Sequence, residues 1–185
     1  MKKILVGISN RHVHLCKEDL EKLFGRTYKL KVLKNLRQPG QFAAEEIVEI
    51  IGNVKLPARI VGPIRNHTQV EILNIDQETL GLKASIKISG DIENTPGIKL
   101  KGSKGVITIK KGVIIAEKHV HLSNEESKIL NLETGSKVKV RHPNGIEFEV
   151  QVRTGEGHLS EFHLDKDEAI SLNIKNRDIV KIIKK

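Results

Sequence analysis

One short segment occurs twice in this chain, and this repeat constrains the fold more than any other feature. The sequence reads RHVHLCKED at residues 11–19 and KHVHLSNEE at residues 118–126. The offset is a constant 107 residues, from His12 to His119 and from His14 to His121. An apolar run precedes each copy and a short amphipathic stretch follows it. The pattern predicts a duplicated unit of strand, His-x-His and helix, and therefore a protein with two related halves.

The rest of the chain favours β-structure. Short β-branched runs bounded by Gly, Pro and Asn are typical of barrels or sandwiches rather than of alternating βαβ units. The expected strands are 3–8, 47–51, 58–61, 69–73, 106–109, 113–116, 137–140, 146–153 and 179–183. Helices are expected at 17–24, 124–130 and 167–172, and the Asn144-Gly145 pair predicts a hairpin turn.

Together these patterns predict a mainly β, α+β fold of two related halves, each a barrel or sandwich, and any site between the halves would be pseudo-symmetric. The Gly- and Pro-bearing stretch 89–105 is the expected junction, which divides the chain into 1–88 and 89–185. With 185 residues the chain can bury about 70% of its unfolded surface, so two small domains need no disulfide to fold.

The paired histidines carry the strongest chemical signal. Residues two apart on an extended chain point to the same face, so each His-x-His can direct two imidazoles at one ion. A third ligand is expected from a polar residue between two large apolar ones, and Glu71 and His163 have that setting. The predicted sites are His12, His14 and Glu71 for one ion and His119, His121 and His163 for a second. Nitrogen and oxygen ligands favour zinc, while iron, cobalt or manganese could bind the same set. Without a metal, the same pattern would indicate polar residues at strand ends and on a solvent face.

Arg65 is a candidate for binding phosphate. It follows the Gly62-Pro63 turn and lies six residues before Glu71, and a guanidinium beside a metal site is suited to bidentate contact with phosphate. The other reading is an ordinary surface charge. The familiar motifs GxGxxG, GxxxxGK[ST], GxSxG and HExxH do not occur, which argues against P-loop enzymes and serine hydrolases.

Composition excludes some classes of partner and site. The formal net charge is +9, which suits nucleic acid, anionic lipid or phosphorylated small molecules. No Trp, one Tyr and four Phe leave few platforms for stacking on bases, so we expect no nucleic-acid partner. A lone Cys16 excludes an internal disulfide and thiolate-rich metal sites. Apolar runs of about five residues are too short to cross a bilayer, so we expect no membrane association and a cytoplasmic protein.

Six blocks of the sequence resemble the phosphate propanoyltransferase family, the PduL-type phosphotransacylases. They occur in family order and cover nearly the whole chain: GISNRHVHL at 7–15, QPGQFAAE at 38–45, GPIR at 62–65, TQVE at 68–71, KHVHL at 118–122 and FHLD at 162–165. The resemblance implies transfer of an acyl group between coenzyme A and phosphate, using two zinc ions between two β-barrels.

Residue by residue, the resemblance carries the family's zinc ligands onto the two sets given above and its phosphate-binding, catalytic arginine onto Arg65. It implies coenzyme A contacts at Ile8, Ser9, Asn10, Arg59, Lys55 and Asn176. The resemblance also implies that acyl-CoA and phosphate are the partners of this protein. It is compatible with a homo-oligomer and with an exchange of strands between the halves.

Several alternatives stay open. Family members inside bacterial microcompartments often carry an N-terminal extension, and this chain begins at its first strand, which favours a free cytoplasmic enzyme. Acetyl or propanoyl preference and the pathway are open, with propanediol degradation one candidate. The rival functions are a dizinc hydrolase and a non-enzymatic, metal-stabilised β-barrel that binds polyanions.

Overall fold

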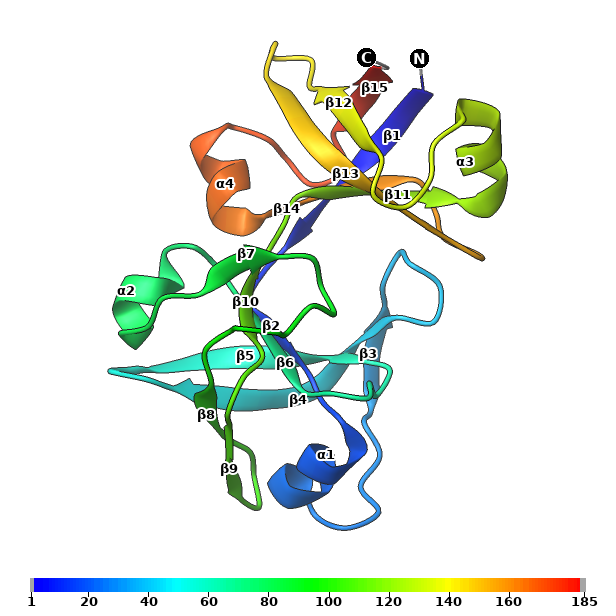
Figure 1. Ribbon diagram of the computed structural model, residues 1–185. Helices are drawn as coiled ribbons and strands as arrows, with labels where there is room; N and C mark the ends of the chain where they lie inside the picture. Colours follow the sequence, from blue (N-terminus) through cyan, green and yellow to red (C-terminus); the bar gives the residue numbers. More distant parts are fainter. Residues whose placement is uncertain (1, 184–185) are drawn as a thin grey trace. The chain divides into compact units, whose positions relative to one another are not determined.

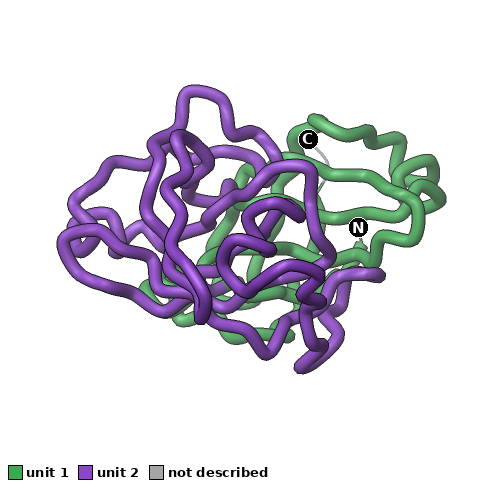
Figure 2. Tube along the Cα trace, turned by 90° about the horizontal axis from the view of Figure 1, so that it is seen from below, with its two compact units in different colours: residues 1–9, 118–185 green, residues 10–117 purple. Residues whose placement is uncertain are grey.

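The structure, a computed structural model, describes residues 2–183 and is built mainly of β-strands. The chain folds into two compact units (Figure 2). Unit 1 contains residues up to Ser9 together with 118 onward, and unit 2 contains Asn10–Glu117. Each unit has its own cluster of buried apolar side chains. The expectation of a mainly β protein with two barrel-like domains is confirmed.

Unit 1 is a closed barrel in the order β1-β14-β11-β13-β12-β15 (Figure 1). The strands are β1 (Lys2–Ser9), β11 (His119–Ser123), β12 (Lys137–Arg141), β13 (Glu147–Gly155), β14 (Glu161–Asp165) and β15 (Ile179–Ile183). Helix α3 (Asn124–Leu130) follows β11 and helix α4 (Lys166–Ser171) follows β14. The predicted hairpin joins β12 to β13, with Gly145 at a φ of 94° that favours glycine.

Unit 2 is a curled sheet in the order β7-β10-β6-β2-β5-β4-β8-β9, with β3 paired to β4. Its strands are β2 (His12–His14), β3 (Val32–Asn35), β4 (Phe42–Ile51), β5 (Lys55–Gly62), β6 (Gln69–Ile72), β7 (Ser85–Lys87), β8 (Ile98–Lys101), β9 (Val106–Ile109) and β10 (Val113–Ala116). Helix α1 (Lys17–Phe24) follows β2, and helix α2 (Asp76–Leu80) follows β6.

The strand before each His-x-His belongs to the other unit. β1 pairs with β14 and β15 in unit 1, while β2, which follows it directly, pairs with β5 and β6 in unit 2. In the second repeat, β10 pairs with β6 and β7 in unit 2, and β11 pairs with β13 and β14 in unit 1. The two repeats therefore exchange their first strands reciprocally.

The compact units do not follow the linear division into 1–88 and 89–185. The stretch 89–105, expected to be a junction, lies inside unit 2, where β8 pairs with β4. The chain instead passes between the units immediately before each His-x-His. The physical reason is the exchange, because β1 and β10 form their hydrogen bonds with strands of the other repeat.

The fold also explains how the histidines are presented. Val13 and Val120, between the two histidines of each pair, are fully buried in the apolar cores of unit 2 and unit 1. Because side chains alternate along a strand, the flanking imidazoles point to the opposite face of the sheet. The buried valine thus fixes which way each pair faces.

Candidate metal centres

The first predicted ligand set comes together in unit 2. His12 lies opposite Glu71 in the antiparallel pairing of β2 with β6, and His14 lies opposite Gln69. The Nε2 atoms of the two histidines are 3.2 Å apart, and Glu71 Oε2 lies 3.4 Å from His12 Nε2. One ligand atom from each of the three residues lies within 4.8 Å of the others. This is the grouping that the sequence predicts.

Backbone carbonyls orient both imidazoles. His12 Nδ1 lies 2.8 Å from the Asn10 carbonyl oxygen, and His14 Nδ1 lies 2.9 Å from that of Val61. A carbonyl oxygen can only accept, so both Nδ1 atoms carry hydrogen and both Nε2 atoms present lone pairs. Lone pairs aimed at each other repel unless a cation lies between them. Zn–N bonds of about 2.0–2.1 Å place two ligands of a tetrahedral site about 3.3 Å apart, so the donor set fits zinc.

The environment favours neutral histidine beside an ionised carboxylate. Burial, together with the neighbouring His12, lowers the pKa of His14 to about 4, although Glu71 acts in the opposite direction. Burial alone would raise the pKa of Glu71, but His12, His14 and a hydrogen bond from Ser89 together hold it well below its usual range. Neutral imidazole and carboxylate are the forms that bind metal ions.

A hydrogen-bond network connects this cluster to Arg65. Gln69 Nε2 and Ser89 Oγ donate to Glu71 Oε1, at 2.7 Å and 2.6 Å. Arg65 NH1 donates to the same Ser89 oxygen at 3.0 Å. Arg65 follows the cis Gly62-Pro63 bond, and its backbone N–H donates to the Leu15 carbonyl oxygen. The guanidinium is therefore held one hydroxyl away from the carboxylate of the cluster.

Arg65 also borders a hollow in unit 2. The hollow has a volume of about 350 Å³ and is lined by Arg65, Asn66, His67, Gln69, Gly90 and Ile92. His67, which the sequence places near Glu71, is exposed at its rim. The hollow therefore borders both Arg65 and Gln69, the residue that donates to Glu71.

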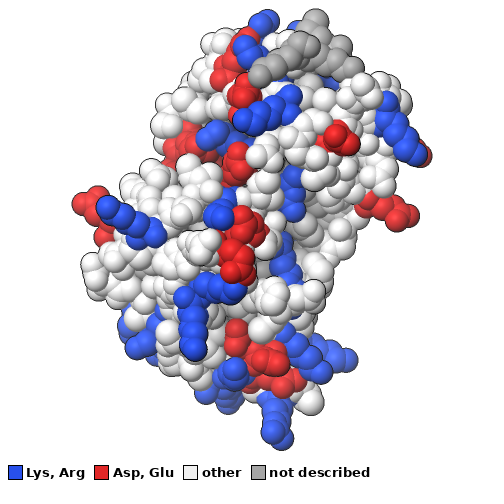
Figure 3. All heavy atoms as spheres, in the orientation of Figure 1, with Lys and Arg blue, Asp and Glu red and all other residues white. Residues whose placement is uncertain are grey.

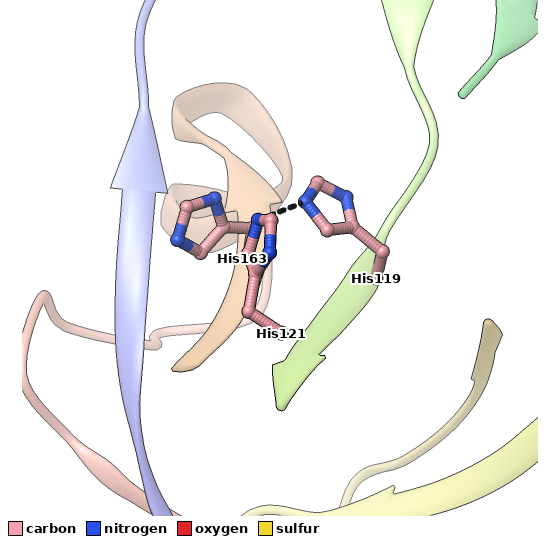
Figure 4. A group of neighbouring side chains, drawn as sticks. All are labelled: His119, His121 and His163. Atoms are coloured by element: carbon pink, nitrogen blue, oxygen red, sulfur yellow. Dashed lines mark hydrogen bonds between the residues drawn. The ribbon is translucent and has the colours of Figure 1, made fainter. Parts of the chain in front are cut away.

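The second predicted ligand set comes together in unit 1 (Figure 4). His119 lies opposite His163 in the antiparallel pairing of β11 with β14, and His121 lies opposite Glu161. The Nε2 atoms of His119 and His121 are 3.0 Å apart, and the ring centroid of His163 lies 5.1 Å from that of His119. The grouping predicted from sequence is present here as well.

Two residues outside the predicted ligand sets touch this cluster. Glu161 Oε2 lies 2.7 Å from His163 Nε2. His158, in the Gly-rich loop before β14, places its Nδ1 3.3 Å from His121 Nδ1. Burial, followed by the neighbouring histidines, lowers the pKa of His121, so its imidazole is neutral. In the sequence, the only sign that Glu161 could contact the cluster is its position two residues before His163. No sequence feature indicates that His158 contacts the cluster.

The predicted coenzyme A residues divide between the units. In unit 1 the Ile8 N–H donates to Asn176 Oδ1 at 3.2 Å, and Ser9 Oγ donates to Asp165 at 2.8 Å. In unit 2 the Asn10 carbonyl binds His12, as described above. Arg59 and Lys55 both lie on β5. The structure thus brings Ile8, Ser9 and Asn176 together at one end of the barrel.

Arg59 lies beside the first cluster, whereas Lys55 does not. Arg59 pairs with His12 in the parallel register of β2 with β5, and its guanidinium donates to the Ala44 and Glu45 carbonyl oxygens. Lys55 is exposed at the start of β5, about 13 Å along the strand from Arg59, with its Nζ 4.0 Å from Glu49.

Comparisons with known proteins find one family along nearly the whole chain. The family model of phosphate propanoyltransferase matches residues 5–175. A phosphate propanoyltransferase of Thermotoga maritima is 43% identical over 97% of this chain and 89% of its own length. Relatives of the same name from Clostridioides difficile and Citrobacter freundii are 41% and 40% identical, over 98% and 94% of this chain and 90% and 85% of their own.

The helices of the chain are short. Among residues 2–183, each helix is too short or too polar to cross a bilayer. Nearly full-length similarity to named acyltransferases, together with the family model, identifies the activity class. The chain belongs to the phosphate propanoyltransferase family and is an acyltransferase enzyme.

Proposed function

We propose that this protein interconverts a short-chain acyl-CoA, propanoyl- or acetyl-CoA, and phosphate with acyl phosphate and coenzyme A, using two zinc ions. Membership of the family supports the phosphotransacylase role. The observation that carries the finer proposal is the pair of clusters, one in each unit, in which three metal-binding side chains converge.

In this proposal each residue of the first cluster has a defined task. His12, His14 and Glu71 hold one ion, and Arg65 binds phosphate through its guanidinium. A guanidinium offers donors in a fixed fork that fits a phosphate in two-point contact. The contact with Ser89 limits how far the arginine can swing away from the cluster. The hollow beside Arg65 and Gln69 gives phosphate its way in.

The second cluster serves the thioester. His119, His121 and His163 hold the other ion, and Ile8, Ser9, Asn10, Arg59, Lys55 and Asn176 contact coenzyme A. When bound, zinc supplies Lewis acidity that stabilises negative charge on the carbonyl oxygen and on phosphate. A phosphate oxygen forms the new bond to the carbonyl carbon as the carbon–sulfur bond breaks and coenzyme A leaves.

Positioning can account for a large part of the rate. Holding two reactants in the correct geometry can remove roughly 7–11 kcal/mol of the barrier, so the reaction needs no covalent enzyme intermediate. The residues then have to bind, orient and neutralise anions, which suits the basic composition of the chain.

The non-enzymatic alternative needs a continuous basic surface. On the face drawn in Figure 3, blue Lys and Arg side chains are interspersed with red Asp and Glu side chains. Among residues 2–183, Lys22 is paired with Asp19 and Lys87 with Asp91. On this face the mixture of charges gives little attraction to an extended polyanion.

One assay separates the candidates. Zinc-loaded protein is mixed with acetyl-CoA or propanoyl-CoA, with and without phosphate, and free thiol is measured over time. Phosphate-dependent release supports the transferase, and equal release without phosphate indicates a hydrolase. No release would indicate a binding protein. A His119→Ala variant should lose activity, while His142→Asn, a change at the buried histidine paired with Asp178, is the matched control.

A further inference from the structure

Each proposed metal site has a polar residue two positions before its third ligand. Gln69 precedes Glu71 on β6, and Glu161 precedes His163 on β14. The registers are equivalent as well, since Gln69 lies opposite His14 and Glu161 lies opposite His121. The side chains of Gln69 and Glu161 therefore occupy the same place in the two related sites.

Gln69 acts as a hydrogen-bond donor to its ligand. The Gly90 N–H donates to Gln69 Oε1 at 2.7 Å, which fixes the orientation of the amide. Its Nε2 therefore faces Glu71 Oε1, and the two atoms are 2.7 Å apart. Gln69 is only 2% exposed. A carboxylate ligand needs donors on its remaining lone pairs, and Gln69 supplies one.

Glu161 acts as a hydrogen-bond acceptor for its ligand. Its Oε2 lies 2.7 Å from His163 Nε2, and an ionised carboxylate only accepts, so Nε2 carries the hydrogen. His163 then keeps Nδ1 as its nitrogen with a free lone pair. An imidazole ligand that donates its other N–H to a carboxylate is held in one tautomer and binds its ion more strongly.

Gly7 leaves room for the Glu161–His163 pair. In the parallel pairing of β1 with β14, Gly7 lies opposite His163. A Cβ atom at Gly7 would stand 2.8 Å from Glu161 Oε1 and 3.0 Å from His163 Cδ2. Glycine inside a strand often marks such a close approach. The exchanged N-terminal strand therefore packs directly over this pair.

We infer that Gln69 and Glu161 are equivalent positioning residues, each matched in hydrogen-bonding character to the ligand that it supports. The donor amide stands behind the carboxylate ligand and the acceptor carboxylate stands behind the imidazole ligand. The inference rests on the proposed function insofar as the two clusters bind metal ions.

The test measures zinc affinity separately from activity. Glu161→Leu and Gln69→Leu remove the hydrogen bond at similar volume, and zinc binding to each metal-free variant is titrated against a chelator of known affinity. Each variant should bind one of its two ions about 10–100-fold more weakly and the other unchanged. Glu161→Gln, whose amide oxygen can still accept, should recover part of the loss. Glu125→Leu, on the exposed face of α3, is the control.

Two further readouts distinguish positioning from general damage to the fold. Urea unfolding of the metal-free Glu161→Leu protein should still be a single cooperative transition, because the change removes one hydrogen bond and leaves the apolar core of unit 1 unchanged. Gly7→Ala, which displaces the same pair, should weaken the same ion as Glu161→Leu. In cobalt-loaded protein, both Glu161→Leu and Gly7→Ala should alter the visible absorption of the ion held by His119, His121 and His163.

The outcomes separate this inference from the proposed function. If the wild-type protein binds no transition metal, the proposed function fails and the inference fails with it. If the wild-type binds two ions and releases thiol with phosphate, but both leucine variants bind zinc with wild-type affinity, only the inference is overturned. A metal-free Glu161→Leu protein that no longer unfolds cooperatively in urea also overturns it, because its loss of zinc affinity would then reflect damage to the fold.

Discussion

Arg65 is tied to the first cluster by one hydroxyl group. Its guanidinium donates to Ser89, and Ser89 donates to Glu71, so the arginine and the carboxylate share a bridging oxygen. The half-buried guanidinium is therefore held in place before any anion arrives. A preoriented donor loses less side-chain entropy when it binds its ligand.

We predict that Arg65→Ala raises the KM for phosphate by one to two orders of magnitude and leaves zinc content at the wild-type level. The reason is loss of a charge-assisted two-point contact, worth about 1.5–3 kcal/mol. Thiol release at varied phosphate, combined with elemental analysis, measures both quantities. Arg65→Lys keeps the positive charge but loses the two-point contact of the guanidinium, so its KM for phosphate should lie between those of the wild-type and Arg65→Ala proteins. Identical phosphate dependence in Arg65→Ala and wild-type protein would exclude the role.

At the scale of the residue, the sequence predicts which side chains group together, and it does not predict what surrounds each group. The two-residue spacing of His12 and His14 places both rings on one face because side-chain alternation is local. The apolar neighbours of Glu71 and His163 are enough to single them out. Ser89 and His158 carry no such signal, since each lies in a loop whose contact with a cluster depends on tertiary packing.

At the scale of the element, the helices after the two His-x-His strands differ in their first turn. Ser123 caps α3, accepting from the Glu126 N–H, while the Glu126 side chain returns to the Ser123 N–H. Cys16 occupies the same place before α1 and forms no side-chain cap hydrogen bond. Thr68 instead approaches Cys16, with its Oγ1 3.5 Å from Sγ.

We predict that Cys16→Ser stabilises the protein by about 0.5–1 kcal/mol, because a hydroxyl can accept from the Asp19 N–H as Ser123 does from Glu126. Urea unfolding at neutral pH, followed by circular dichroism, measures the difference. Ser123→Ala is the reciprocal control and should destabilise by a similar amount. A Cys16→Ser protein less stable than wild type would show that packing of the thiol outweighs the cap.

Glu126 gives the same helix a pH-dependent contribution. Burial raises the pKa of Glu126, but hydrogen bonds from Lys2 and Ser160 lower it by more, so its pKa lies below the usual value of 4.5. A carboxyl group with a depressed pKa stabilises the fold above its unfolded pKa, and this stabilisation is lost as pH falls through the folded pKa.

We therefore expect Glu126→Gln to lower stability by about 1 kcal/mol at pH 7, with the difference from wild type shrinking below about pH 4.5. Unfolding midpoints in urea at a series of pH values measure this trend. Glu125→Gln, at an exposed neighbour in the same turn, should match wild type throughout. A stability difference between Glu126→Gln and wild type that stays the same below pH 4.5 would contradict a lowered pKa for Glu126.

Elements with local signals are the ones that the sequence predicts best. The expected helices 17–24 and 124–130 agree with α1 and α3, and 167–172 differs from α4 by one residue at each end. Helix α2 is not predicted, because its five residues carry no clear apolar periodicity. Short strands such as β3 and β7 are not predicted either; they are largely exposed and depend on their partners rather than on their own alternation.

For the whole molecule, the central feature is the reciprocal exchange of β1 and β10. The repeat in the sequence predicts two related halves. It does not predict which half each strand joins, since pairing between strands far apart in the sequence depends on the three-dimensional register. For the same reason the linear division at residue 88 differs from the compact units.

Metal removal should act on both units. An ion that binds only the folded protein stabilises it by about 2.7 kcal/mol at a free concentration one hundred times its Kd. We predict that a chelator lowers the midpoint of thermal unfolding and abolishes thiol release, and that zinc restores both. Scanning calorimetry of metal-free, zinc-loaded and reloaded protein measures the shift. Equal midpoints in all three samples would contradict metal binding by either cluster.

The exchange also determines how the gene could be cut and rejoined. A segment covering 10–117 carries every strand of unit 2, whereas unit 1 is assembled from two pieces that are far apart in the sequence. Lys2 on β1 pairs with Ile182 on β15 in antiparallel register, so the beginning and end of unit 1 are adjacent. A tight hairpin joining them would make a circular permutant of 118–183 followed by 2–9, in which unit 1 becomes one uninterrupted polypeptide.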